Sequence, residues 1–295
     1  MMIGWIDTVI QGVLLGGLYA LFAAGLSLIF GIMRLVNFAH GELLMVGGYA
    51  LVLFAGPPWP VMLVVTILVV IGFALAMERA AFRPVREASP ATLLVTSFAV
   101  SFLLQNTAQL VMGPLPKTTN VSNTLIQSWK IGFVFIAKRD VLTIIVTFTL
   151  LVFLGLFLAR TRLGVEMRAA AEDFRMARLL GVRANRVIAA SFAIAGVLAG
   201  VASFLLVAQT GTVTPTMGLG PVLVGFVAIV LGGMGSLRGA VIGGFLLGVI
   251  TVTLQAYLPI NLNFYRDAFV YGTVIAVILI RPQGIIVPRS ARTRI

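Results

Sequence analysis

The feature that most constrains this chain is a series of long apolar stretches separated by short polar breaks. About 20 helical residues cross the hydrocarbon core of a bilayer, and most of these stretches are about that long. Backbone N–H and C=O groups in lipid must bond within their own segment, so such stretches indicate helices. A transmembrane β-barrel would show short segments of alternating hydrophobicity, which this sequence lacks. The sequence therefore predicts an all-α polytopic membrane protein.

Composition supports lipid as the solvent. Charged residues make up 10% of the chain, whereas a soluble domain carries about 25%. The chain has no cysteine, which excludes disulfides, thiol catalysis and thiolate metal sites. The net charge of +12 could suggest nucleic acid, but arginines in a membrane chain mark the cytoplasmic side, and we expect no nucleic-acid partner. No Lys or Arg precedes the first stretch, so it lacks the basic region of a signal peptide and is expected to be retained.

We expect a single transmembrane domain over residues 1–295 with eight or nine helices, eight if one short segment is re-entrant. The expected spans are, approximately, 8–33, 39–55, 61–77, 91–112, 141–159, 187–207, 222–231, 239–258 and 268–280.

The distribution of basic residues predicts the orientation. Most of the 21 Lys and Arg lie in alternate breaks, namely at Arg34, 79–87, 160–186, Arg238 and 281–295. The opposite breaks carry Lys117, Lys130, Lys138, Arg139 and Arg266. Because cytoplasmic loops carry the excess of Lys and Arg, we expect the loop at about 160–186 and the C-terminus in the cytoplasm. The N-terminus and the loop at about 113–139 should lie outside.

The fourth span contains a polar stripe. Ser97, Ser101, Gln105 and Gln109 recur every four residues, and Asn106 lies beside them. This spacing places the stripe on one helix face. A polar stripe in lipid should turn toward another helix or a water-filled path, so it either bonds neighbouring helices or lines a substrate pathway.

The break between the first two spans supplies three more candidate pathway residues, Asn37, His40 and Glu42. Glu42 is the one ionisable candidate at membrane depth, where such groups are functional by default. A packing role is favoured for His40, which lies two residues from Glu42 and so should not face it on a helix.

The sequence offers no motif for catalysis or nucleotide binding. No Lys follows Gly in a P-loop pattern, so the chain cannot bind ATP that way. With one His and no Cys, we expect no metal site, no convincing nucleophile–base pair and no enzymatic activity.

The segment from Arg160 to Arg186 is unusually polar for this chain. A helix is predicted from Glu166 to Gly181, where glycine is a plausible stop. One side of this helix would be apolar and the other charged, with opposite charges three and four residues apart. The apolar side comprises Ala170, Phe174, Ala177 and Gly181, and the charged side Arg168, Glu172, Arg175 and Arg178. This helix is either a solvated tether or a surface that a protein partner grips.

Two segments, 26–50 and 227–248, share an order of apolar run, Gly-x-Met break, arginine and small-residue helix. Internal repeats are common in transporters, although lipid-facing composition alone could also produce this similarity.

Three segments resemble the permease subunits of ABC importers for branched-chain amino acids, of the LivH type. They are GLYALFAAGLSLIFGIMRLVNFAHGELLMVGGY (17–49), RAAAEDFRMARLLGV (168–182) and FVAIVLGGMGSLRGAVIGG (226–244), and the resemblance extends over nearly the whole chain.

This resemblance implies a type II ABC importer permease in a bacterial inner membrane. It implies a second, similar permease of the LivM type, two cytoplasmic ATPases that hold ATP and Mg²⁺, and a periplasmic substrate-binding protein. The loop at about 160–186 would then be the coupling loop, whose motif is matched by Ala170, Ala171, Glu172, Ala177 and Gly181. The loop departs from the wider EAA motif of ABC importer permeases because no Leu-Pro follows Gly181.

The expected function is therefore to move branched-chain or related hydrophobic amino acids, with force applied to the coupling loop by separate ATPases. A neutral polar pathway would equally suit urea, short amides or other small organic solutes. An autonomous secondary carrier remains the alternative from another class.

Overall fold

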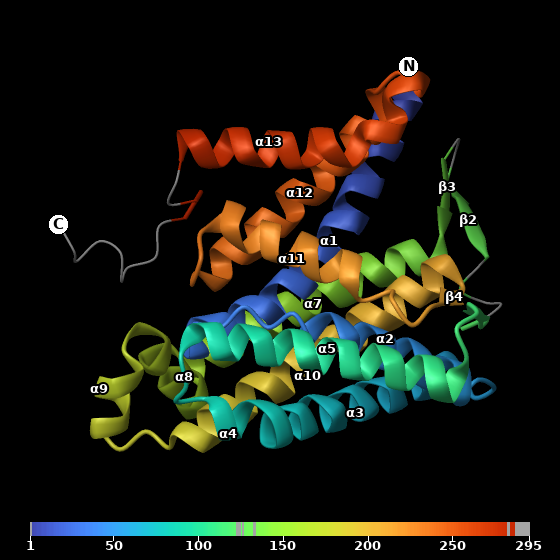
Figure 1. Ribbon diagram of the computed structural model, residues 1–295. Helices are drawn as coiled ribbons and strands as arrows, with labels where there is room; N and C mark the ends of the chain where they lie inside the picture. Colours follow the sequence, from blue (N-terminus) through green and yellow to red (C-terminus); the bar gives the residue numbers. More distant parts are fainter. Residues whose placement is uncertain (1, 122–124, 126, 132–133, 282–283, 287–295) are drawn as a thin grey trace.

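The computed structural model describes residues 2–121, 125, 127–131, 134–281 and 284–286. Each stretch expected to span the membrane is helical (Figure 1). The corresponding helices are α1 (Met2–Met33), α2 (His40–Leu53), α3 (Trp59–Met77), α5 (Pro90–Met112), α7 (Lys138–Arg160), α10 (Ala184–Thr210), α11 (Leu219–Gly232), α12 (Leu237–Tyr257) and α13 (Arg266–Ile280). This confirms an all-α membrane fold.

Six helices in the described part of the chain are long and apolar enough to cross a bilayer, namely α1, α3 with its extension, α5, α7, α10 and α12. Helices α2 and α11 have 14 residues each. At 1.5 Å per residue they are about 21 Å long, short of a hydrocarbon core of about 30 Å. A non-helical segment precedes each of them, so each is a short helix that covers only part of the bilayer thickness.

The third span continues further than expected. A π-helical turn over Glu78–Phe82 and the short helix α4 (Arg83–Val85) extend α3 beyond the predicted end at Met77. The side chain of Glu78 is buried. The sequence interpretation ended the span at the first charged residue, but neighbouring packing keeps the backbone helical there.

The connections lie at two opposite ends of the bundle (Figure 1). At one end, strands β2 (Ser128–Ile131) and β3 (Val134–Ala137) form an antiparallel hairpin, and β1 (Lys117–Thr118) pairs with β4 (Thr212–Val213). At the other end lie α8 (Arg162–Glu172) and α9 (Phe174–Leu179). A 3₁₀ segment, η2 (Ile260–Tyr265), precedes α13. The two loops that the sequence assigned to opposite sides of the membrane therefore lie at opposite ends.

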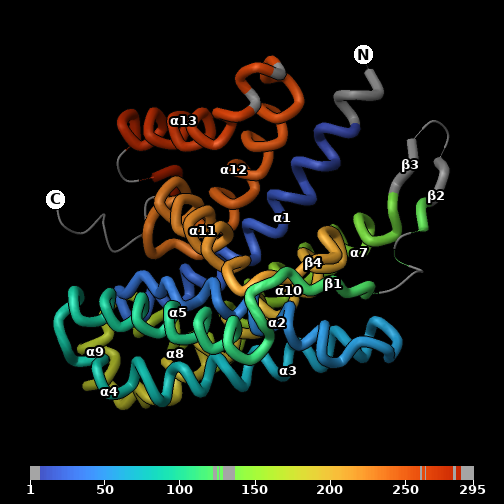
Figure 2. The backbone as a smooth tube through the Cα atoms, turned by 45° about the vertical axis from the view of Figure 1, so that its right-hand side comes forward, coloured from blue at the N-terminus to red at the C-terminus, as the bar shows by residue number. Residues whose placement is uncertain are grey.

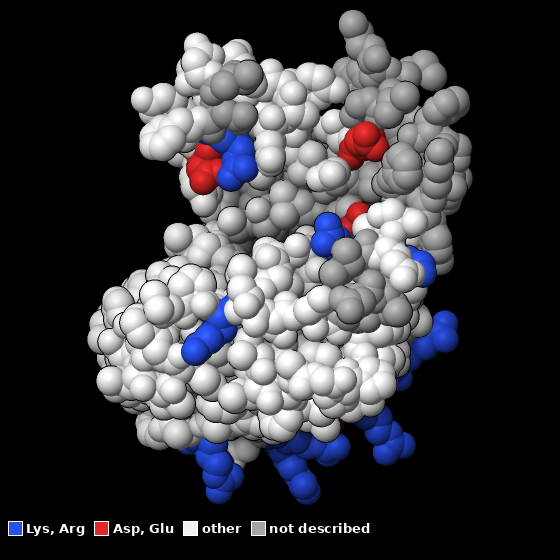
Figure 3. Space-filling model, turned by 90° about the vertical axis from the view of Figure 1, so that its right-hand side faces the viewer, with Lys and Arg blue, Asp and Glu red and all other residues white. Residues whose placement is uncertain are grey.

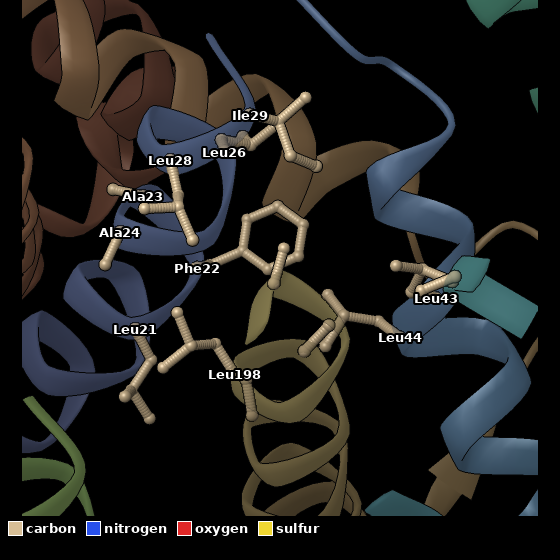
Figure 4. Packing of buried hydrophobic residues seen from close by; sticks show 14 of the residues in the cluster. Leu21, Phe22, Ala23, Ala24, Leu26, Leu28, Ile29, Leu43, Leu44 and Leu198 are labelled. Atoms are coloured by element: carbon tan, nitrogen blue, oxygen red, sulfur yellow. The ribbon is translucent and has the colours of Figure 1, made fainter. Parts of the chain in front are cut away.

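Helix α1 is the centre of the bundle and packs against α12, α10, α11 and α7 (Figure 2). Its neighbours approach closely because glycines face it. A Cβ on Gly248 would lie 2.2 Å from the backbone of Gly16, and one on Gly244 would lie 2.6 Å from the backbone of Ala20. Small residues at membrane helix interfaces allow such contacts. Figure 4 shows Phe22 and Leu21 of α1 directed toward Leu198 of α10 and Leu44 of α2.

The helix contacts repeat with a two-fold pattern. Helix α1 packs on α12 and α11, as α10 packs on α3 and α2, and α1 and α10 touch each other. The series α1, α2, α3, α5 thus corresponds to α10, α11, α12, α13, and α1 and α10 run in opposite directions (Figure 1). This arrangement pairs α2 with α11.

The repeat suggested by the sequence therefore pairs the wrong helices: it pairs α2 with α12, whereas the contacts pair α2 with α11. Its segments, 26–50 and 227–248, matched the break before α2 to the break before α12. Arg34 lies in the first break and Arg238 in the first turn of α12, and both lie at the α8 end of the bundle. This shared position explains the similarity.

Candidate functional site

One part of the candidate site is the point where the two short helices, α2 and α11, meet. The N-termini of α2 and α11 touch: a Cβ on Gly41 would lie 2.4 Å from the carbonyl oxygen of Gly218, and one on Gly218 would lie 2.3 Å from that of Gly41. Both positions are open to glycine alone, because any side chain would collide with backbone. Two helix N-termini, each with a partial positive charge, are therefore directed at one region of the bundle.

Glu42 lies in the first turn of α2 and is completely buried. Its Oε1 accepts hydrogen bonds from Ser101 Oγ at 2.8 Å and from Gln105 Nε2 at 2.7 Å. Gln105 Nε2 also lies 3.2 Å from Ser101 Oγ. The other carboxyl oxygen, Oε2, is buried without a hydrogen-bond partner among the described residues. The α5 stripe and the α2 break thus form one buried polar cluster, which we call the Glu42 cluster.

Three members of the predicted stripe, Ser97, Ser101 and Gln105, are buried on one face of α5. Ser97 Oγ donates to the carbonyl oxygen of Leu94 at 2.8 Å and approaches that of Val36 at 3.5 Å. Asn106 does not join them. Its Nδ2 donates to the carbonyl oxygen of Phe102 on its own helix, on the outer face of α5. A position one residue beyond Gln105 is rotated by about 100° on a helix, which removes Asn106 from the cluster.

His40 and Asn37 are buried but lie apart from the hydrogen bonds of the cluster. The ring of His40 packs on Phe22, with ring centroids 4.8 Å apart, and its Nε2 lies 2.9 Å from where a Cβ of Gly25 would be. Both ring nitrogens of His40 and both amide atoms of Asn37 lack partners among the described residues. His40 therefore faces α1 while Glu42 faces α5, as their spacing predicts.

The predicted helix from Glu166 to Gly181 is wrong as a single element. Asp173 interrupts it, with φ −145° and ψ 101°, and separates α8 from α9. Asp173 Oδ1 accepts a hydrogen bond from the backbone N–H of Met176 at 2.9 Å and so caps α9. The predicted charged side is consequently divided: Arg168 and Glu172 lie on α8, and Arg175 and Arg178 on α9. The periodicity gave no signal for this break, although an Asp three residues before an N–H that needs a partner is a recognisable cap.

The predicted apolar side of this loop does face the bundle. Ala170 and Ala177 are buried, and Phe174 is half-buried. Gly181 has φ +90°, which suits glycine at a helix end. Ala171 receives a hydrogen bond from outside the loop: Arg34 Nη2 donates to its carbonyl oxygen at 3.1 Å. The coupling-loop candidate is therefore tied directly to the break that leads into α2, a link that sequence spacing could not reveal.

The outer face of α9 combines apolar and basic side chains. Met176, Leu179 and Leu180 are 53%, 77% and 80% exposed. A groove of about 430 Å³ lies beside them, lined by Phe174, Arg175, Arg178 and Leu179. We call this surface the α9 groove.

Further arginines continue from the α9 groove across the same end. A second depression, of about 490 Å³, is lined by Arg86, Arg178, Arg183, Ala184, Asn185 and Arg186. Arg178 Nη1 lies 3.8 Å from the exposed carboxylate of Glu87, and Arg86 bonds Asn185. Figure 3 shows basic side chains projecting along the lower border, the level at which Figure 1 places α3, α4 and α9, while most of the remaining visible surface is uncharged.

The described residues hold no group of three His, Asp or Glu side chains that could bind a metal ion. The described residues form a buried polar cluster at the centre and an exposed apolar and basic surface at one end, with Arg34 hydrogen-bonded to α8 between them.

Comparison with known proteins gives a consistent result. A family model described as "Branched-chain amino acid transport system / permease component" matches residues 8–279. The chain is 35% identical over 297 residues to the high-affinity branched-chain amino acid transport system permease protein BraD of Pseudomonas aeruginosa, covering 96% of this chain and 95% of that protein. It is 34% identical over 302 residues to the corresponding LivH protein of Escherichia coli K12, with the same coverage. A probable permease protein LivH of Methanocaldococcus jannaschii is 28% identical over 300 residues.

Proposed function

The chain belongs to the permease component family of branched-chain amino acid transport systems, and from this premise we propose how it works. It is a permease subunit of an ABC importer. We propose that its own substrates are branched-chain or related hydrophobic amino acids, as the names of its relatives state for them. Separate subunits would supply the energy, and the α8–α9 loop would receive it.

The observation that carries this proposal is the α9 groove. A membrane protein that exposes Leu179 and Leu180 beside arginines, at the end of the bundle rather than along its lipid-facing sides, presents a surface suited to a protein partner. Two ATPase subunits with bound ATP and Mg²⁺ are the proposed occupants, one for this chain and one for a second, LivM-type permease. A substrate-binding protein would deliver the amino acid at the β2–β3 end.

The route for force follows from the contacts around Ala171. A displacement of α8 pulls on Arg34 through its hydrogen bond, and Arg34 begins the segment that ends at α2. Helix α2 carries Glu42, whose partners lie on α5. A ligand shifts a conformational equilibrium only through different affinities for its states, and ATP binding in the partner subunits would supply that difference.

We propose that the Glu42 cluster borders the substrate pathway. Buried ionisable groups in membrane helices usually mark such pathways. Oε2 of Glu42, which has no partner among the described residues, and the N-termini of the short helices α2 and α11 offer one acceptor and two positive dipole ends. Those are the groups that complement an ammonium and a carboxylate, the two ends of an amino acid.

The orientation belongs to the same proposal. The α8–α9 end carries most of the arginines, so it is assigned to the cytoplasm of a bacterial cell, with the N-terminus on the outer side of the inner membrane.

Variants of the α9 groove test this function. Leu179→Asp and Arg175→Glu should each abolish most ATP-driven leucine uptake, because they place a carboxylate where the partner must bury apolar and basic side chains. Co-purification of the ATPase with the permease should fall in parallel. Arg162→Glu is the matched control, since Arg162 is an exposed arginine of α8 outside the groove.

Normal uptake and normal ATPase recovery in both groove variants would reject the docking surface. Uptake by the permease reconstituted alone, without ATPases, would reject the importer mechanism in favour of a secondary carrier.

A further inference from the structure

We propose that a cavity between α1, α7, α8 and the α11–α12 turn binds an anionic phospholipid. The cavity has a volume of about 630 Å³ and lies at the α8 end of the bundle. Ser27 and Gly31 of α1 form its floor, and Gly155 and Leu156 of α7 form one wall. Three arginines, Arg34, Arg168 and Arg238, line its rim.

The rim has an excess of positive charge. Among the described residues, none of these three guanidinium groups pairs with a carboxylate within salt-bridge distance. Arg34 Nη2 donates to the carbonyl oxygen of Ala171 at 3.1 Å, and Arg168 Nη2 lies 3.4 Å from that of Ala159. The carboxylate of Glu172 also lines the cavity, so one negative charge stands against three positive ones. Guanidinium groups offer several N–H donors in a planar fork that matches phosphate oxygens.

Most of the remaining lining is apolar, apart from Ser27 and Ser236, and membrane-spanning helices border it. Val152 and Leu156 of α7 are about half-exposed, and Leu237 of α12 lies opposite them. Toward the middle of the bundle, Phe148 and Phe245 stack with ring centroids 5.4 Å apart and join α7 to α12. An acyl chain would find apolar walls here beneath a basic rim. A free soluble anion would use the rim alone.

A second observation comes from the floor. Ser27 is 3% exposed, lines the cavity and has no hydrogen-bond partner for its Oγ among the described residues. A buried hydroxyl without a partner is destabilising. The ester carbonyls of a glycerophospholipid, which follow the phosphate toward the acyl chains, are acceptors that would satisfy it. Basic pockets between transmembrane helices on the cytoplasmic side bind phospholipid headgroups in this way.

The site has a mechanical consequence. Arg168 and Ala171 lie on α8 and Arg34 begins the segment leading to α2, so a bound phosphate would join the two elements that we propose to transmit force. The experiment below nevertheless measures lipid binding itself. Its result is independent of whether the α9 groove binds an ATPase.

Native mass spectrometry of the complex purified with its partner subunits tests the proposal. Phosphatidylglycerol and phosphatidylcholine are titrated separately, and the lipid-bound fraction is compared between variants. Arg238→Gln removes one charged contact and should lower phosphatidylglycerol affinity roughly tenfold, the effect of about 1.4 kcal/mol. Gly155→Leu keeps all three arginines and places a bulky side chain in the cavity. A Cβ at Gly155 meets nothing within 4 Å. It should therefore reduce phosphatidylglycerol binding without disturbing the fold.

Gly72→Leu is the matched control, since a Cβ at Gly72 on α3 also meets nothing within 4 Å and lies outside the cavity. Preferential retention of phosphatidylglycerol that both cavity variants weaken and Gly72→Leu preserves supports the site. Three results overturn it: equal retention of the two lipids, unchanged binding in both cavity variants, or displacement of the bound lipid by inorganic phosphate or leucine at equal concentration.

Discussion

At the scale of residues, the Glu42 cluster shows how a buried carboxyl is held within an apolar bundle. Oε1 has two donors from α5, and Oε2 has none among the described residues. An unpaired buried oxygen is destabilising by about 1–3 kcal/mol. Such a cost is tolerated where the group has a task, and Glu42 directly follows Gly41, whose backbone meets that of Gly218.

Gln105→Leu should separate this cluster from ordinary packing. It removes one of the two donors to Glu42, so we expect a loss of about 1–3 kcal/mol of stability and a marked decrease in leucine uptake. Thermal unfolding in detergent and uptake by reconstituted complexes measure the two effects. Asn106→Leu is the matched control, because Asn106 bonds only its own helix on the outer face of α5. Full uptake in Gln105→Leu would limit the cluster to helix packing.

At the scale of elements, the division between α8 and α9 decides which side chains the proposed partner could reach. Helix α8 packs inward through Met167 and Ala170, whereas α9 exposes Met176 and Leu179. One continuous helix would place these apolar groups at fixed angles along a single axis. The break at Asp173 lets the two helices face different partners, α8 the bundle and α9 the exposed end.

Asp173→Ala should weaken this division. The variant loses the cap of α9, which typically costs about 1 kcal/mol, and allows α8 to continue through the break. We expect reduced ATPase co-purification and reduced uptake with little change in the melting temperature of the bundle. Asp173→Asn keeps a capping oxygen and should restore both. Equal impairment in the two variants would show that the carboxylate charge, rather than the cap, is what matters.

At the scale of the whole molecule, small residues set the distance between the two halves of the repeat. Gly244 and Gly248 bring α12 against α1, and Gly196 and Gly200 bring α10 against α3. The hydrophobic effect does not drive helices together in lipid, so close packing supplies much of the association. The central contacts are therefore more sensitive to added volume than the periphery.

Gly248→Val should prevent correct packing, because a Cβ would lie 2.2 Å from the backbone of Gly16. We expect little folded protein, or a large loss of thermal stability, by size-exclusion chromatography and melting in detergent. Gly272→Ala on α13 meets nothing within 4 Å and should be neutral or slightly stabilising, since alanine is the better helix former. Comparable yields and melting temperatures for both variants would contradict the proposed packing.

The sequence by itself determined that lipid surrounds this protein and where, approximately, its membrane helices lie. The hydrophobicity and the length of a segment decide whether it crosses lipid, and both can be read from that segment alone. The stripe Ser97, Ser101 and Gln105 was predictable for the same reason, because helical periodicity fixes which residues share a face. The stop at Gly181 followed from the local preference of glycine.

Only the tertiary structure decided which faces meet. It placed Glu42 against Ser101 and Gln105, joined Arg34 to Ala171, and brought Gly41 to Gly218 across the bundle. It also divided the predicted helix from Glu166 to Gly181 at Asp173 and assigned Asn106 to the outer face of α5. The most distant of these pairs, Gly41 and Gly218, lies more than half the chain length apart. They depend on shape and packing between helices, and a local pattern of hydrophobicity contains no information about either.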